Sequence, residues 1–126
     1  MRKGRNRVWM TPRNAIPSCY DSPAMTKQHF FVRLLPPRAT FPMDITPEEK
    51  LLMQDHARYT RESFDAGKIL IYGPVMAPTG AFGMAVFEAE DASEVRHFLE
   101  NDPSVRAGLN TFEIHPMRLG AAQGPK

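Results

Sequence analysis

The residues best suited to chemistry in this sequence are a histidine within a predicted helix and an aspartate beside a proline. His56 lies in the segment MQDHARYTRESF (53–64), on an apolar stripe of helical spacing where an aliphatic residue is expected. Asp55 is adjacent, but successive helical residues point about 100 degrees apart, so its carboxylate faces elsewhere. Asp102 is better placed, because it ends a second predicted helix on the same sheet face. A histidine oriented by a carboxylate can accept and return a proton near neutral pH.

Both residues also have ordinary structural interpretations. Histidine is of intermediate burial and is satisfied by one hydrogen bond, so His56 taken alone is more often a filler of the helix stripe than a catalyst. An aspartate before Pro103 is a common cap for a short helical turn such as the one predicted at 103–107. The residues by themselves leave both interpretations open.

The sequence lacks the motifs of several common sites. None of the four histidines has the HExxH spacing of a zinc helix, and the single cysteine, Cys19, cannot form a thiolate cage or a disulfide framework. GxSxG, Walker A and GxGxxG motifs are missing, and GAFG at 80–83 is too short and falls in a predicted hairpin. We therefore expect neither a metal nor a cofactor.

Length and composition predict one folded domain. The chain has 126 residues, 42% of them hydrophobic, and a net charge of +2. No apolar run approaches the roughly 20 residues that cross a bilayer, and no apolar segment follows the basic N-terminus as in a secretory signal. We expect a cytoplasmic protein without a membrane partner.

The basic character is concentrated at the N-terminus. Residues 1–24 carry five Lys or Arg and one acid, whereas the chain from Met25 onward carries eleven bases and thirteen acids. This stretch has no helical or strand period and contains three prolines, so we predict a disordered basic extension. An arm that binds nucleic acid and a mitochondrial targeting segment are alternatives. Five charges without a folded basic face are a weak nucleic-acid footprint, and the stretch shows no amphipathic targeting helix. We favour a dispensable extension, or a start upstream of an initiator at Met25, and expect no nucleic-acid partner.

The rest of the chain predicts strands and helices in the order β-α-β-β-α-β. The strands are expected at 28–35, 68–75, 81–90 and 109–119, and the helices at 47–66 and 91–102. The first helix has a capping box at Thr46 and Glu49 and a glycine, Gly67, at its end. This order is that of the ferredoxin-like α+β fold, an antiparallel sheet with two helices on one face.

The first predicted strand is apolar on both faces. Phe30, Val32 and Leu34 alternate with Phe31 and Leu35, so neither face has the polar pattern of a solvated surface. A folded part of about a hundred residues has no second layer to cover the face without helices. We therefore predict that a second copy covers it, in a homodimer.

Five segments together resemble the YciI-like, or YCII-related, domain family. They are HFFVRLLPPRATF, MQDHARYTRESFDAGKILIYGPV, PTGAFG, FEAEDASEVRHFLENDPSVRAGL and FEIHPMR, and they extend from residue 28 to about 118. The shared features are a helix-borne histidine, a strand ending in Gly73-Pro74, and Asp-Pro followed by Ala-Gly. We assign the domain to 25–120 and expect 121–126 to be a flexible tail.

The resemblance implies a ferredoxin-like fold that dimerises into an α+β barrel, with His56 and Asp102 as the catalytic pair. Similar proteins include enzymes that eliminate chloride from chlorinated ring compounds. We predict a cofactor-independent enzyme, of lyase or isomerase type, that transfers a proton on a small organic substrate of unknown identity. Substrate-binding candidates are Arg33, Tyr59, Gly73 and Pro74. The alternative is a non-catalytic dimeric module that binds a small ligand or another protein.

Overall fold

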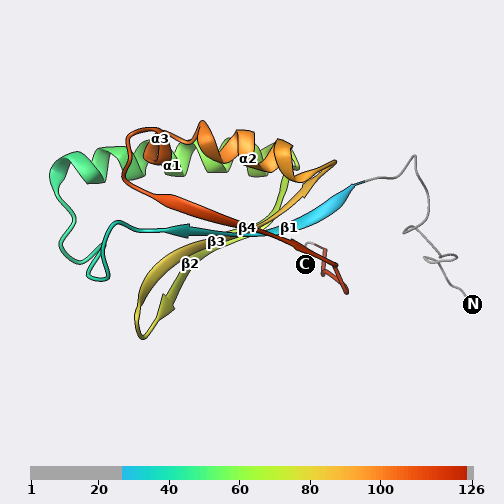
Figure 1. The fold of residues 1–126 in the computed structure, drawn as a ribbon, viewed down its shortest axis with the longest axis horizontal. Coiled ribbons are helices and arrows are strands. Elements are labelled where there is room, and N and C mark those ends of the chain that lie inside the picture. Colours follow the sequence, from blue (N-terminus) through green and yellow to red (C-terminus); the bar gives the residue numbers. More distant parts are fainter. Residues whose placement is uncertain (1–26, 125–126) are drawn as a thin grey trace, which may run out of the picture.

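The protein folds as one four-stranded sheet with helices on one of its faces (Figure 1). The structure is a computed structural model, and it describes residues 27–124. Its elements, in chain order, are β1 (Gln28–Leu35), α1 (Pro47–Asp65), β2 (Ile69–Ala77), β3 (Gly80–Ala89), α2 (Ala92–Glu100), α3 (Pro103–Arg106) and β4 (Thr111–Met117).

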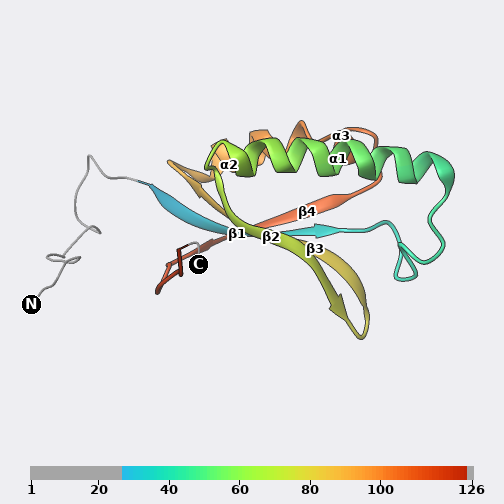
Figure 2. The ribbon, with the colours of Figure 1, turned by 180° about the vertical axis from the view of Figure 1, so that it is seen from behind.

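The strand order is β2-β3-β1-β4, and every neighbouring pair is antiparallel. The views from front and back show α1, α2 and α3 on the same side of the sheet, while the far end of the β2–β3 hairpin bends away from them (Figure 2). The predicted ferredoxin-like α+β fold is confirmed, with α3 as an additional short helix between α2 and β4.

The core lies between the helices and the sheet. Phe30 and Val32 of β1 point toward the helices and pack with Phe87 of β3. Val95 and Leu99, four residues apart on α2, complete this cluster from the helix side. Burial of each such side chain contributes about 1.5–3 kcal/mol to stability, so this layer fixes the helices on the sheet.

Helix α1 begins and ends where its sequence predicts. The Thr46 hydroxyl accepts a hydrogen bond from the Glu49 backbone N–H, and the Glu49 carboxylate accepts one from the Thr46 N–H, which completes the capping box. At the other end Gly67 has φ of 84°, a conformation that favours glycine. These two signals position the long helix that carries His56.

Several boundaries differ from the prediction by one or two residues; the last strand, for example, is Thr111–Met117 and not 109–119. The second strand continues to Ala77, so the hairpin turn consists of Pro78 and Thr79 alone. Helix α2 ends at Glu100, and Asp102 belongs to the next element, as the N-cap of α3. Pro103 explains the difference at α2, because it cannot continue α2 but suits the first position of a new helix.

The sheet face opposite the helices mixes apolar side chains with ionisable ones, which include His29, Glu88, Glu113 and His115. Phe31 lies beside Val86, and Arg33 lies between Met84 and Glu113 in the register of β3, β1 and β4. The Arg33 guanidinium sits 4.5 Å from the centre of the Phe82 ring and 3.5 Å from the Glu113 carboxylate. The prediction that both faces of β1 carry apolar side chains is met.

The predicted extension at 1–24 lies outside the described residues, as do the last two residues of the predicted tail at 121–126. Residues 121–124 have no helix or strand. Within residues 27–124, no helix is long and apolar enough to span a membrane.

Candidate active site

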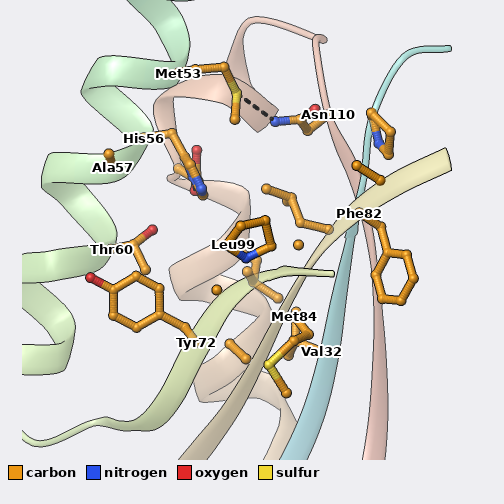
Figure 3. Close-up of a pocket in the computed structure, with 18 of the residues that line it drawn as sticks. Val32, Met53, His56, Ala57, Thr60, Tyr72, Phe82, Met84, Leu99 and Asn110 are labelled. Atoms are coloured by element: carbon orange, nitrogen blue, oxygen red, sulfur yellow. Dashed lines mark hydrogen bonds and ion pairs between the residues drawn. The ribbon is translucent and has the colours of Figure 1, made fainter. Parts of the chain in front are cut away.

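A cavity of about 380 Å³ lies between α1 and the helix-facing side of the sheet. Figure 3 shows Met53, His56, Ala57 and Thr60 along α1 on one wall, with strand residues opposite them. Most of the lining is aromatic or aliphatic. Its aromatic residues are Phe41, Tyr72, Phe82, Phe87 and Phe98. A mainly apolar cavity with a few polar groups is the usual form of a small-molecule site.

His56 and Asp102 meet at this cavity, and both line it. The His56 Nδ1 atom lies 2.6 Å from the Asp102 Oδ2 atom. The Asp102 side chain is 1% exposed, whereas the His56 side chain is 21% exposed. The aspartate is therefore a buried partner of a histidine that remains accessible from the cavity.

The local fold of the chain holds Asp102 in place. As N-cap of α3, its Oδ1 atom accepts hydrogen bonds from the Ser104 backbone N–H at 2.8 Å and from the Ser104 hydroxyl at 2.7 Å. The Oδ2 atom is left for His56. The two interpretations that the sequence left open, a cap and a histidine partner, thus hold at the same time, one for each carboxylate oxygen.

The surroundings of Asp102 favour its ionised form. Burial acts to raise the pKa of Asp102, but the hydrogen bond and charge of His56, followed by the two donors of Ser104, outweigh it and lower the pKa below the usual aspartate value. An ionised carboxylate only accepts hydrogen bonds, so the Nδ1–H of His56 is the donor. The lone pair of the neutral ring is then on Nε2, for which no hydrogen-bond partner is present among the described residues.

Two of the four predicted substrate-binding residues line the cavity and two do not. Gly73 and Pro74, on β2, are in its wall. Tyr59 is not in the wall: its hydroxyl donates to the Phe98 backbone oxygen at 2.8 Å, and its ring stacks on the Phe98 ring. Burial, with a smaller effect of the Asp102 charge, raises the pKa of Tyr59, so its hydroxyl stays protonated.

Arg33 lies on the opposite face of the sheet from His56, because it alternates with the helix-facing residues Val32 and Leu34. Within one chain it therefore does not reach the cavity. Its position gives no support to the prediction that it holds a substrate group.

Sequence reasoning missed three polar side chains of the cavity wall, those of Thr60, Tyr72 and Asn110. Thr60 is one helical turn after His56 and is buried. Asn110 directly precedes β4 and is also buried. The spacing from His56 to Thr60 is a signal for the first. For Asn110 the signal is its place in the predicted strand at 109–119, where it alternates onto the face of Phe112 and Ile114.

A loop at 36–45 supplies another part of the lining through Pro36, Phe41, Pro42 and Ile45. Arg38 fixes this loop to the start of α1: its guanidinium donates to both oxygens of Glu49 at 2.8 Å and to Asp44 at 2.9 Å. The hydrogen bond from Arg38, followed by that from the Thr46 backbone N–H, lowers the pKa of Glu49 to about 2.

No group of three or more histidine, cysteine or acidic side chains suitable for a metal ion occurs in residues 27–124. The only ionisable side chains of the cavity wall there are His56, Asp102 and Tyr72.

The sequence model of the YCII-related domain matches residues 29–118, from the start of β1 to just beyond β4. The chain belongs to the YCII-related domain family. The match covers every helix and strand around the cavity, so the predicted family is confirmed. No curated protein sequence matches this YCII-related protein.

One similar solved structure is a 5-chloro-2-hydroxyhydroquinone dehydrochlorinase from Burkholderia phenoliruptrix AC1100, in complex with 2,5-dihydroxybenzoquinone. It shares 25% sequence identity, with a TM-score of 0.50, over 72% of this chain and 95% of that chain. Together with membership of the YCII-related family, this likeness supports a small-molecule enzyme. The catalytic role of His56 and Asp102 stays a prediction.

Proposed function

We propose that this protein is a cofactor-independent enzyme in which His56, oriented by Asp102, transfers a proton on a small ring compound in an elimination or isomerisation. The observation that carries the proposal is the 2.6 Å contact of His56 Nδ1 with a buried carboxylate, at the wall of an apolar cavity of about 380 Å³. The similar dehydrochlorinase favours a ring compound and an elimination.

The geometry suits a general base. Because Asp102 accepts the Nδ1–H, Nε2 keeps a lone pair and can take a proton from a substrate C–H or O–H. The positive charge that then forms on the ring lies next to the carboxylate, which stabilises it. The apolar lining limits competing protonation by water.

The same first step serves both reaction types. When Nε2 removes the proton, the electron pair of the broken bond forms a new double bond in the substrate. In an elimination, chloride leaves with the electron pair of its C–Cl bond, and the proton passes from His56 to solvent. In an isomerisation, no group leaves and His56 returns the proton to a different atom. Neither route needs an oxidant or a reductant.

A homodimer is part of this proposal. The face of the sheet without helices presents Phe31 and Met84, together with Ile71, which is 57% exposed, and a second copy packed there would cover them. The similarity to the dimeric barrel family supports this arrangement.

The proposal is tested by chloride release from chlorinated hydroquinones, with 5-chloro-2-hydroxyhydroquinone as the first compound. Deuterium uptake from D₂O by the same compounds detects proton transfer without a full turnover. We expect His56→Gln to reduce either rate by about 10²- to 10⁴-fold, the usual contribution of a general base. His97→Gln, a change on the exposed side of α2, is the matched control and should leave the rates unchanged.

Full activity of His56→Gln would contradict the proposal. Ligand binding in the cavity without proton transfer or turnover by the wild-type protein would favour the alternative, a non-catalytic module that binds a small ligand.

A further inference from the structure

Asn110 is a buried polar side chain in the cavity wall that the fold leaves largely unsatisfied. It is 3% exposed, and it lines the same cavity as His56. Figure 3 shows its amide nitrogen directed toward α1, where Met53 and His56 lie one helical turn apart. The carboxamide and the imidazole thus belong to one part of the site.

The hydrogen bonding of Asn110 is incomplete. Its backbone N–H donates to the Ser104 carbonyl oxygen at 3.1 Å. Its side-chain amide donates only to the Met53 sulfur, at 3.4 Å, among the partners available in residues 27–124. A thioether is a weak acceptor, and a carboxamide has two N–H donors and two acceptor sites. This side chain lines the cavity, so its unused hydrogen-bonding capacity is open to a ligand there.

The charges of the wall restrict what that ligand is. No lysine or arginine lines the cavity in the described part of the chain, and the only carboxylate there, Asp102, is engaged by Ser104 and His56. A carboxylate or phosphate on a ligand would have no counter-charge from this wall. A carboxamide suits an uncharged carbonyl or hydroxyl oxygen, and the aromatic side chains around it suit a flat ring.

We propose that Asn110 is a substrate-binding residue that donates its amide N–H to a carbonyl or hydroxyl oxygen of an uncharged ring compound. This inference rests on the proposed function and adds a substrate class to it. Asn110 holds the oxygenated edge of the ring while His56 exchanges the proton. A hydrogen bond to that oxygen also stabilises the negative charge that develops on it when a proton leaves the ring.

The test compares three probes on the full-length protein: 4-chlorophenol, chlorobenzene and 4-chlorobenzoate. Dissociation constants come from NMR titrations that follow Ala57 and Thr60, two residues of the cavity wall. We expect 4-chlorophenol to bind most tightly. Asn110→Leu should weaken the binding of 4-chlorophenol by about fivefold, the usual effect of one neutral hydrogen bond. The affinity for chlorobenzene should not change.

A second measurement uses the wild-type protein alone, so it does not depend on whether a variant folds. The side-chain NH₂ signals of Asn110 should move on addition of 4-chlorophenol and stay in place with chlorobenzene. Met53→Leu keeps the apolar volume but removes the sulfur acceptor, so it should retain the preference for 4-chlorophenol.

The outcomes separate this inference from the proposed function. If both neutral probes bind in the cavity and Asn110→Leu leaves their ratio unchanged, the role of Asn110 is wrong while that of His56 stands. If Met53→Leu and Asn110→Leu lose the preference for 4-chlorophenol equally, the inference is also wrong. The contact between Met53 and Asn110 would then support the shape of the cavity, and Asn110 would not bind the ligand itself. If no probe moves Ala57 or Thr60, the cavity does not bind ring compounds, and both proposals fail.

Discussion

Replacing Asp102 with asparagine removes the charge of the buried side chain and keeps its shape. The carboxylate accepts three hydrogen bonds, two from Ser104 and one from His56. In the variant the single amide oxygen stays with the two Ser104 donors, so the NH₂ group faces His56 Nδ1. Two donors cannot pair, and the ring must move its proton to Nε2. The lone pair is then lost from the side of the ring available to a ligand.

The expected effects follow from this rearrangement. Turnover in the proposed reaction should fall by about 10²- to 10⁴-fold, because the base is in the wrong tautomer. Stability at pH 7 should fall by about 1–2 kcal/mol, since a hydrogen bond to a charged group is replaced by a neutral one.

The loss of stability should depend on pH in a defined direction. Burial raises the pKa of Asp102, but the contacts with His56 and Ser104 outweigh it, and the folded pKa lies below the ordinary value. The stability that ionised Asp102 contributes is thus present above the unfolded pKa of about 3.9 and is lost as the pH falls through the lower folded pKa. The difference between the wild-type protein and Asp102→Asn should therefore shrink below about pH 4.

The tautomer is measured by ¹⁵N NMR of the His56 ring, and the stability by urea unfolding at pH 7 and below pH 4. Asp55→Asn is the control, because that carboxylate adjoins His56 in sequence but pairs with Arg58 on the exposed side of α1. An Nδ1–H ring in Asp102→Asn, or equal effects of the two substitutions, would refute the reasoning.

Three further predictions concern the rest of the chain. Arg38→Met should raise the pKa of Glu49 from about 2 toward its ordinary value, which NMR titration of the Glu49 carboxyl carbon measures. An unchanged pKa would show that Arg38 does not hold the 36–45 loop to α1. A chain that starts at Met25 should fold and sediment as a dimer, whereas a stable monomer at micromolar concentration would contradict the homodimer. Removal of residues 1–24 should not change binding to short DNA or RNA at physiological salt, and a salt-sensitive affinity that disappears with them would reveal a nucleic-acid arm.

Local signals were enough to predict the main elements. The capping box at Thr46, the glycine after α1 and the alternation in β1 are short-range features, and each fixes one boundary or one face. The end of α2 was placed two residues too late, because Asp102 suits both the end of one helix and the cap of the next.

The composition of the site was harder to predict. Both faces of β1 carry apolar residues, so alternation shows that Arg33 and Val32 point in opposite directions but not which of them faces the helices. The cavity is lined by segments that are far apart in sequence, from the loop at 36–45 through α1 to Asp102 and Asn110. Asn110 falls in the predicted strand at 109–119, and alternation places it on the face of Phe112 and Ile114, but only the folded chain shows that this face borders the cavity there.

The loop at 36–45 and the His56–Asp102 pair belong to separate stretches of sequence, although both face one cavity. Exchange of this loop between related chains would alter the size and shape of the space beside the ring without touching α1 or α3. If the proposed function holds, the choice of substrate and the transfer of the proton can therefore diverge independently, and a transplanted loop must keep the contact between Arg38 and Glu49.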